Sequence, residues 1–189
     1  MDMLKLLHSR AGELHNILSR SIKDLRADIV QIYAIIDCTK LVYAIKCLKA
    51  AMLNVVPIVR VGDVGQDDHK QLMNGRCRKL NVTFSATNLR GCHITSLKSW
   101  LGISALAFTE EVESSLLYSE SDMQNRGSSR RELVTCYAES PLSEVNEKVV
   151  TNHVHRVWVV DQEGLLVGVV SLTNVITVIR HSLLSDSND

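Results

Sequence analysis

The stretch HRVWVVDQEGLLVGVVSLTNVITVI, residues 155 to 179, decides the fold. Two apolar runs flank the tight turn at residues 161 to 164 and predict two strands, after which the chain enters a helix. Ser171, Thr173 and Asn174 lie where the second strand gives way to this helix. A helix N-terminus offers unpaired backbone N–H groups and the positive end of a dipole. Hydroxyls and a carboxamide at this junction therefore suit a phosphate and a ribose.

Two elements precede this stretch, and the same order of elements occurs earlier in the chain. Residues 133 to 137 (LVTCY) predict a strand, and Ser140 with Pro141 predicts a helix with Ser140 as its N-cap. Residues 32 to 36 (IYAII) predict an earlier strand, followed by Thr39 as the N-cap of another helix. The apolar stripe of that helix recurs at steps of three and four residues: Leu41, Ala44, Ile45, Leu48 and Met52.

These elements form an internal repeat. Thr39 and Ser140 are 101 positions apart, and this offset holds without a gap through the helix and the next strand. It falls to 86 where Ser85-Ala86-Thr87-Asn88 matches Ser171-Leu172-Thr173-Asn174. The first copy has a longer connection, residues 62 to 79, whose three glycines and polar residues predict a loop or long hairpin. Two copies of strand–helix–strand–strand–helix indicate an α/β (α+β) architecture.

The repeat and the local composition set the domain boundaries. We predict a lead-in helix in residues 1 to 20, a first domain in residues 21 to 112 and a second domain in residues 132 to 186. The intervening residues 113 to 131 are rich in Ser, Glu and Arg and read as a linker. Within the first domain, Pro57 places its apolar strand, Val55 to Val59, at a sheet edge or an irregularity.

Composition excludes several classes of protein. The 21 basic and 21 acidic residues among 189 give zero net charge, so no nucleic-acid partner is expected. Apolar runs are too short to span a bilayer, and charges interrupt the first 18 residues, so neither a membrane span nor a signal peptide is expected. Five scattered cysteines predict reduced thiols rather than a disulfide framework. We expect an intracellular protein, cytoplasmic or nuclear.

Several passages resemble cystathionine-β-synthase (CBS) domains: HVHRVWVVDQEGLLVGVVSL at residues 153 to 172, its GVVSLTN junction, and VTFSATNLRGC at residues 82 to 92, followed by LKSWL. More narrowly they resemble the gamma subunits of AMP-activated and SNF1-related protein kinases, especially the divergent plant members. The resemblance covers about residues 20 to 184. It implies tandem CBS domains paired with pseudo-two-fold symmetry as a Bateman module, whose clefts accept AMP, ADP or ATP. Nucleotide would be a ligand and not a catalytic cofactor.

The resemblance also implies partners. A complete gamma subunit has four CBS copies, whereas this chain has two and looks like the C-terminal half of such a subunit. Kinase alpha and beta subunits are the implied partners. Self-association through CBS modules would cover surface that a missing half would otherwise bury.

The family's nucleotide contacts match positions in the second copy. His155 and Arg156 match the basic pair at the phosphate, and Ser171 and Thr173 match the hydroxyl positions. Asn174 departs from the usual Asp, whose carboxylate accepts bonds from both ribose hydroxyls. The carboxamide should weaken binding by roughly 1–2 kcal/mol. Without a ligand, the hydroxyls read as simple helix caps and the basic pair as a surface feature.

The first copy matches the family less well. Ser85, Thr87 and Asn88 repeat the junction, but Asn54 and Val55 replace the basic pair. Binding is therefore expected at the second copy, with Thr39 at the lip of the site.

Other constellations favour simpler interpretations. The spacing of Cys77, Cys92 and His93 is irregular for a metal site, and Trp100 and Trp158 read as packing residues. Residues 126 to 131 (RGSSRR) read as solvated linker, with phosphorylation as the alternative. No nucleophile–base constellation is recognisable, so no enzyme is predicted. The sequence favours a nucleotide-binding regulator of a kinase complex over an interaction scaffold that has kept the CBS fold but lost nucleotide sensing.

Overall fold

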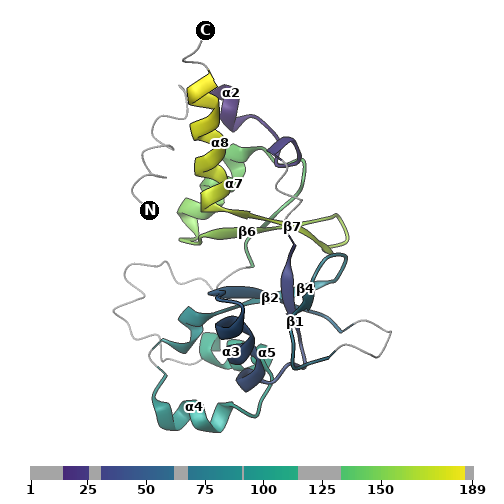
Figure 1. Cartoon of the computed structure of the whole chain (residues 1–189), viewed down its shortest axis with the longest axis vertical. Helices are drawn as coiled ribbons and strands as arrows, with labels where there is room; N and C mark the ends of the chain where they lie inside the picture. Colours follow the sequence, from purple (N-terminus) through teal and green to yellow (C-terminus); the bar gives the residue numbers. More distant parts are fainter. Residues whose placement is uncertain (1–14, 26–30, 62–67, 91, 115–132, 186–189) are drawn as a thin grey trace. The chain divides into compact units, whose positions relative to one another are not determined.

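A computed structural model describes residues 15 to 25, 31 to 61, 68 to 90, 92 to 114 and 133 to 185. The chain divides into two compact α/β units. The first unit comprises residues 33 to 133, and the second comprises residues 134 to 189 together with residues 1 to 32. Each unit has its own sheet and its own hydrophobic core, as the repeat predicts (Figure 1).

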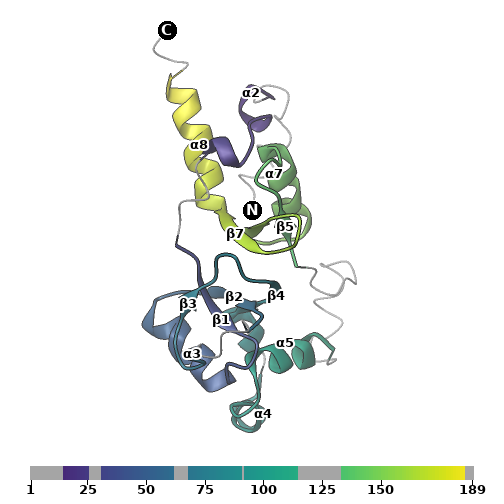
Figure 2. The same ribbon diagram turned by 90° about the vertical axis from the view of Figure 1, so that its right-hand side faces the viewer.

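The first unit has a four-stranded sheet in the order β3-β1-β2-β4. Strands β1 and β2 are parallel, whereas β3 and β4 are antiparallel to their neighbours. Helices α3 and α5 contact each other and contribute to the core on one face of the sheet (Figure 2). The elements are β1 (Tyr33–Ile36), α3 (Leu41–Ala50), β2 (Val55–Val59), β3 (Met73–Asn74), β4 (Leu80–Ser85), the 3-10 helix η3 (Ala86–Leu89), α4 (Ile94–Trp100) and α5 (Ala105–Ser114).

The second unit has a three-stranded sheet in the order β5-β6-β7, covered on one face by α7 and α8. Helix α2, the described part of the predicted lead-in helix, contacts both α7 and α8. In the part of the chain that the structure describes, no helix combines the length and apolar character needed to cross a bilayer. The elements are α2 (His15–Leu18), the 3-10 helix η1 (Lys23–Leu25), β5 (Thr135–Cys136), α7 (Leu142–Thr151), β6 (Arg156–Val160), β7 (Leu166–Ser171) and α8 (Leu172–Ser185).

The strand registers confirm the internal repeat. Val55 pairs with Ser85 in the first unit, and Arg156 pairs with Ser171 in the second. These pairs keep the offsets of 101 and 86 found in the sequence. Both antiparallel ladders also shift register at the equivalent step, before Val59 and before Val160. A shared irregularity indicates that the two units follow one backbone design.

Residues 20 to 22 pack on the second unit. The Ile22 N–H donates to the carbonyl oxygen of Ser140 at 3.0 Å, and the Leu142 N–H donates to that of Arg20 at 2.9 Å. Ile22 is buried in the core of this unit. The predicted start of the first domain at residue 21 is therefore corrected to Tyr33, because residues 20 to 25 close the second unit instead.

The first unit is closed in the same way by residues 103 to 105. The Ala105 N–H donates to the carbonyl oxygen of Thr39 at 2.7 Å, and the Leu41 N–H donates to that of Ile103 at 2.9 Å. Helix α5, which starts here and precedes the second unit in the chain, belongs to the core of the first. Each copy of the repeat is thus closed by the segment that leads into the other copy. The predicted linker begins inside α5, and residues 115 to 132 lie outside the described residues.

The two units protect the outer edge of their first strand differently. In the first unit the longer connection supplies β3, which pairs with β1 and was predicted only as part of a loop or hairpin. The same insertion places the Lys70 carbonyl oxygen 3.5 Å from the Cys47 thiol on α3. In the second unit the Lys148 ammonium donates to the carbonyl oxygen of Thr135 in β5 at 2.7 Å. A lysine over an edge strand opposes pairing with another chain.

Local differences from the sequence predictions occur at helix starts and at Pro57. Lys40 and Pro141, not Thr39 and Ser140, are the N-cap residues of α3 and α7. Pro57 lies in β2, an inner strand, and the register shift comes later. At the equivalent position of the second unit, the Trp158 N–H donates to the Val134 carbonyl oxygen at 3.1 Å. A proline cannot donate this bond, so the first unit holds its parallel strands without it.

Met52, predicted as part of the buried helix stripe, lies beyond the end of α3 with its side chain 92% exposed. Its φ of 53° is left-handed, as is that of its counterpart His153 at 52°. We expect Met52→Gly to raise the free energy of unfolding by about 1 kcal/mol, because glycine adopts this conformation without a Cβ clash. Thermal unfolding would measure the change. Ala50→Gly, inside α3, should instead destabilise by roughly 0.5–1 kcal/mol. A loss of stability in Met52→Gly would contradict the backbone assignment.

Candidate functional site

The second unit places Arg156 and Ser171 on one face of its sheet. They are directly opposed in the antiparallel ladder, so their side chains project from the same face. The next opposed pair, Val157 and Val170, belongs to the hydrophobic core between sheet and helices. Because side chains alternate along a strand, Arg156 and Ser171 project from the opposite face, away from that core. Trp158 shares this second face and is buried, which agrees with its predicted role in packing.

Ser171 and Asn174 bond reciprocally at the junction between β7 and α8. The Asn174 side-chain oxygen Oδ1 accepts from the Ser171 N–H at 2.9 Å and also from the Ser171 hydroxyl. The Asn174 N–H in turn donates to Ser171 Oγ at 3.2 Å. Ser171 and Asn174 are three residues apart, as in a capping box, and this spacing is the sequence signal for the arrangement. The accepting oxygen of Asn174 is therefore used in capping.

The remaining residues of this junction are accessible. His155 and Thr173 are exposed and Arg156 is half-buried. The His155 carbonyl oxygen accepts from the Leu172 N–H at 3.0 Å, which ties the start of β6 to the start of α8. Arg156 has no ion-pair partner among the residues that the structure describes. A guanidinium and a hydroxyl thus lie near the N-terminus of a 14-residue helix, a combination that suits an anion.

The junction of the first unit repeats the capping but not the cation. The Ser85 N–H donates to Asn88 Oδ1 at 2.7 Å, and the Thr87 N–H donates to Ser85 Oγ at 3.2 Å. The Ala86 N–H donates to the Asn54 carbonyl oxygen at 2.9 Å, the counterpart of the Leu172 bond to His155. Asn88 is 2% exposed, so its amide is unavailable to a ligand. Val55 stands opposite Ser85, where the second unit has Arg156.

The helix that follows the junction also differs between the units. In the first unit Ser85 leads into a 3-10 helix of four residues, η3, and not into a long α-helix as in the second. A short helix aligns few peptide dipoles, so it attracts an anion weakly. Both this difference and the absent arginine favour the second unit as the anion site.

Thr39 lies at the other end of its sheet from Ser85, Thr87 and Asn88. It follows the C-terminal end of β1, where Ile36 pairs with Val59, whereas Ser85 pairs with Val55 at the N-terminal end of β2. The Thr39 side chain is fully buried, and its hydroxyl has no hydrogen-bond partner. The structure therefore separates Thr39 from the junction of its own unit.

Three of the five cysteines, Cys47, Cys92 and Cys136, are buried or partly buried. All five are free, and no cluster of metal-ligating side chains occurs among the described residues. Burial raises the pKa of the Cys136 thiol to about 12, and it also raises the pKa values of Cys47 and Cys92. These three thiols are protonated near neutral pH, which suits packing and not nucleophilic attack.

Comparison with known proteins bears on these features. The family model of the CBS domain matches residues 129 to 181. Two curated Arabidopsis thaliana proteins are similar along the chain. SNF1-related protein kinase regulatory subunit gamma-like PV42b is 43% identical over all of this chain and 52% of its own length. The PV42a protein is 47% identical over 97% of this chain and 48% of its own length. The chain thus spans about half the length of these relatives.

Solved structures support the fold. The CBS domain of a bacterial CNNM/CorC family Mg2+ transporter, solved in complex with ATP, superposes with a TM-score of 0.58 at 13% identity. The match covers 88% of this chain and 91% of that one. The family model, the whole-length similarity and the repeated register agree with the resemblance seen in the sequence. Residues 129 to 181 thus match the CBS domain, and the chain as a whole resembles about half of a plant SNF1-related protein kinase regulatory subunit gamma-like protein.

Proposed function

We propose that this chain is a non-catalytic regulatory module that binds an adenine nucleotide and acts on an SNF1-related or AMP-activated protein kinase complex. The similarity over the whole chain to two proteins named as gamma-like regulatory subunits carries this proposal. The relatives are named for regulation, and burial raises the pKa values of the Cys47, Cys92 and Cys136 thiols, which makes these thiols poor nucleophiles. Both observations favour regulation over catalysis.

The nucleotide phosphate would lie at the junction of the second unit. Arg156 supplies a permanent cation on the same sheet face as Ser171, and exposed Thr173 supplies a hydroxyl in the first turn of α8. The N-terminus of α8 adds the positive end of the helix dipole. AMP, ADP or ATP is the proposed ligand, with the phosphate held by these groups and the ribose near Asn174.

Asn174→Asp should tighten nucleotide binding by about tenfold, equivalent to roughly 1–2 kcal/mol. One aspartate oxygen would keep the bonds from Ser171, and the other would replace the amide nitrogen as a charged acceptor for ribose hydroxyls. Calorimetric titration with AMP, ADP and ATP would measure the change in affinity. Unchanged affinity in this variant would show that residue 174 makes no ribose contact.

Two variants control this experiment. Asn88→Asp makes the same substitution in the first unit, where Asn88 is buried and no arginine is opposite Ser85. It should not tighten binding. Arg156→Gln removes the cation but leaves a polar side chain of similar length. It should weaken nucleotide binding whether it is made in the natural chain or in the Asn174→Asp variant. If millimolar nucleotide neither binds nor stabilises the natural chain, nucleotide sensing is lost.

An interaction scaffold without sensing is the second candidate function. One observation favours it: the side-chain oxygens of Asn88 and Asn174 are both used in capping. Neither junction has the carboxylate of the family pattern. Co-purification with kinase alpha and beta subunits separates the candidates. A regulator should alter kinase activity in response to nucleotide, whereas a scaffold should recover the subunits equally with and without it.

We further propose that the chain associates with a second CBS module. Its relatives are about twice as long, so a second copy would supply a comparable number of residues.

A further inference from the structure

We propose that the exposed face of α3 docks against the exposed face of α7 in a second copy of this chain. The inference rests on the proposed association with a second module and names the surfaces that make it. Each face is centred on an exposed charged residue at the same position of the repeat. That residue is Lys46 on α3 and Glu147 on α7.

The two faces carry complementary patterns. On α3, Tyr43, Lys46 and Lys49 follow one another at three-residue steps and therefore lie on one side of the helix. The equivalent positions on α7 are Glu144, Glu147 and Val150. The repeat has thus kept the position of this face but reversed its charge, from basic in the first unit to acidic in the second.

An antiparallel crossing brings these patterns together. With Lys46 opposite Glu147, a residue three positions later on one helix lies opposite a residue three positions earlier on the other. Lys49 then meets Glu144, and Tyr43 meets Val150. Two α3 helices crossed in this way would place Lys46 against Lys46, and two α7 helices would place Glu147 against Glu147. Opposite charges therefore select the mixed pairing, and like charges oppose the other two.

The central charges of these faces are available, whereas Glu144 already forms an ion pair with Lys148 at 2.7 Å. Neither Lys46 nor Lys49 has an ion-pair partner among the described residues. Lys46 is 5.7 Å from the centre of the Tyr43 ring, which leaves its ammonium on the exposed side of α3. Hydrogen bonding from Lys148, and secondarily from Ser140, lowers the pKa of Glu144, so this carboxylate is charged at neutral pH. Lys148 bonds to only one of its oxygens, Oε1.

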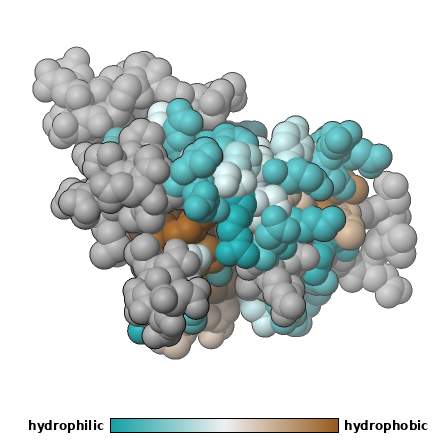
Figure 3. Space-filling model, turned by 90° about the horizontal axis from the view of Figure 1, so that it is seen from above, coloured by the Kyte–Doolittle hydropathy of each residue, from teal (hydrophilic) through white to brown (hydrophobic). Residues whose placement is uncertain are grey.

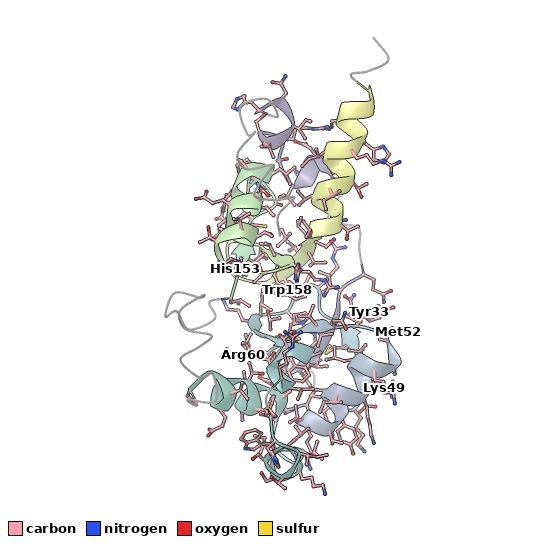
Figure 4. The ribbon with its side chains drawn as sticks, turned by 90° about the vertical axis from the view of Figure 1, so that its left-hand side faces the viewer. Tyr33, Lys49, Met52, Arg60, His153 and Trp158 are labelled. Carbon is pink, nitrogen blue, oxygen red and sulfur yellow. The ribbon has the colours of Figure 1, made fainter. Side chains whose placement is uncertain are left out.

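The ends of the faces are also exposed. Lys49 and Met52 lie at the C-terminal end of α3, as Figure 4 shows. Met52 adds an apolar side chain beside the basic residues. Figure 3, which views the molecule from above, shows apolar patches among the hydrophilic residues, and the large apolar side chains exposed among the described residues are Tyr33, Met52, Val61, Ile94 and Tyr137. Charge, rather than a broad apolar patch, is therefore expected to set the orientation of the two copies, and salt should weaken their association.

Substitutions that reverse the charge of Lys46 or Glu147 test the pairing. Sedimentation equilibrium of the full chain should show dimers that dissociate as salt rises. Lys46→Glu and Glu147→Lys should each weaken dimerisation by about tenfold or more, because each places like charges at the centre. The double variant should restore it to within about threefold. An equimolar mixture of the two single variants should form heterodimers, since each contact then joins opposite charges.

Matched variants separate docking from folding and from nucleotide binding. Lys98→Glu on α4 and Glu110→Lys on α5 change exposed charges by the same amount, and they should leave dimerisation unchanged. All variants should keep the thermal stability and the nucleotide affinity of the natural chain. A monomer at 100 µM-scale concentration, a dimer indifferent to Lys46→Glu, or single variants that stay apart on mixing would each overturn the α3–α7 pairing.

Discussion

Replacing Phe108 with alanine is expected to lower the free energy of unfolding by about 3–5 kcal/mol. The Phe108 side chain is fully buried in the core of the first unit. Its ring makes edge-to-face contacts with Trp100, at a centroid distance of 5.5 Å, and with Phe84, at 6.4 Å. Truncation would leave a cavity between α5 and the sheet and remove both aromatic contacts. For a domain of ordinary stability, this loss is a large fraction of the total.

Chemical denaturation would measure this loss, and hydrogen exchange would locate it. Amides of β2 and β4 should lose protection, because these strands carry the sheet on which Phe108 packs. Glu110→Ala provides the matched control on the same helix. Its side chain is exposed, so its effect should stay within about 0.5 kcal/mol. Equal effects for the two variants would show that α5 does not pack on this sheet.

Replacing Ile22 with alanine is expected to destabilise the second unit by about 2–5 kcal/mol. Ile22 precedes the first repeat in the chain, yet its side chain is buried in the second unit's core. Its N–H also bonds to the Ser140 carbonyl oxygen. The truncated side chain would leave a cavity beside α7 and α8, whereas the sheet of the first unit would keep all its contacts.

Hydrogen exchange distinguishes packing of Ile22 on the second unit from packing on the first unit, which follows it in the chain. Protection should fall in β6 and β7 and persist in β2 and β4. Lys23→Ala is the neighbouring control, because the Lys23 side chain is exposed. If Ile22→Ala instead exposed the amides of β2 and β4, residues 21 to 25 would belong to the first unit, as the sequence had predicted.

Strands and their repeat could be predicted from the sequence because apolar runs and turn residues are local signals. The predicted strand Val55 to Val59 matches β2 at both ends. The offsets of 101 and 86 also reproduce the observed strand pairs. Such signals depend on alternation and burial that each strand carries within its own few residues.

Other elements escaped prediction because distant contacts determine them. The two-residue strand β3 is too short to show alternation and exists through its pairing with β1. Helix α5 extends into residues whose polar composition suggested a linker, although Ala105, Phe108 and Val112 anchor it in the core. No local pattern indicates that residues 20 to 25 pack on the second unit, because that choice depends on tertiary contacts.

The candidate site was predicted in part. The structure gathers His155, Arg156, Ser171, Thr173 and Asn174 around one junction, whose nucleotide role remains a prediction. Helix capping was predicted for the Ser171 and Thr173 hydroxyls but not for the Asn174 side chain, whose oxygen accepts from Ser171. The cap assigned to Thr39 was wrong because that residue faces the protein interior and the helix begins after Lys40. A propensity for capping indicates where a helix can start, but packing decides the residue.

The closure of the second unit by residues 20 to 25 determines how the chain can be divided into fragments that fold. Cleavage within residues 115 to 132 would separate the two copies of the repeat in sequence but not the two folded units. The N-terminal fragment would retain residues 20 to 25, which complete a structure whose strands lie wholly in the C-terminal fragment. The first unit therefore lies within the N-terminal fragment, whereas the second unit depends on both fragments, and the gene segment that encodes the second repeat does not by itself encode a finished domain.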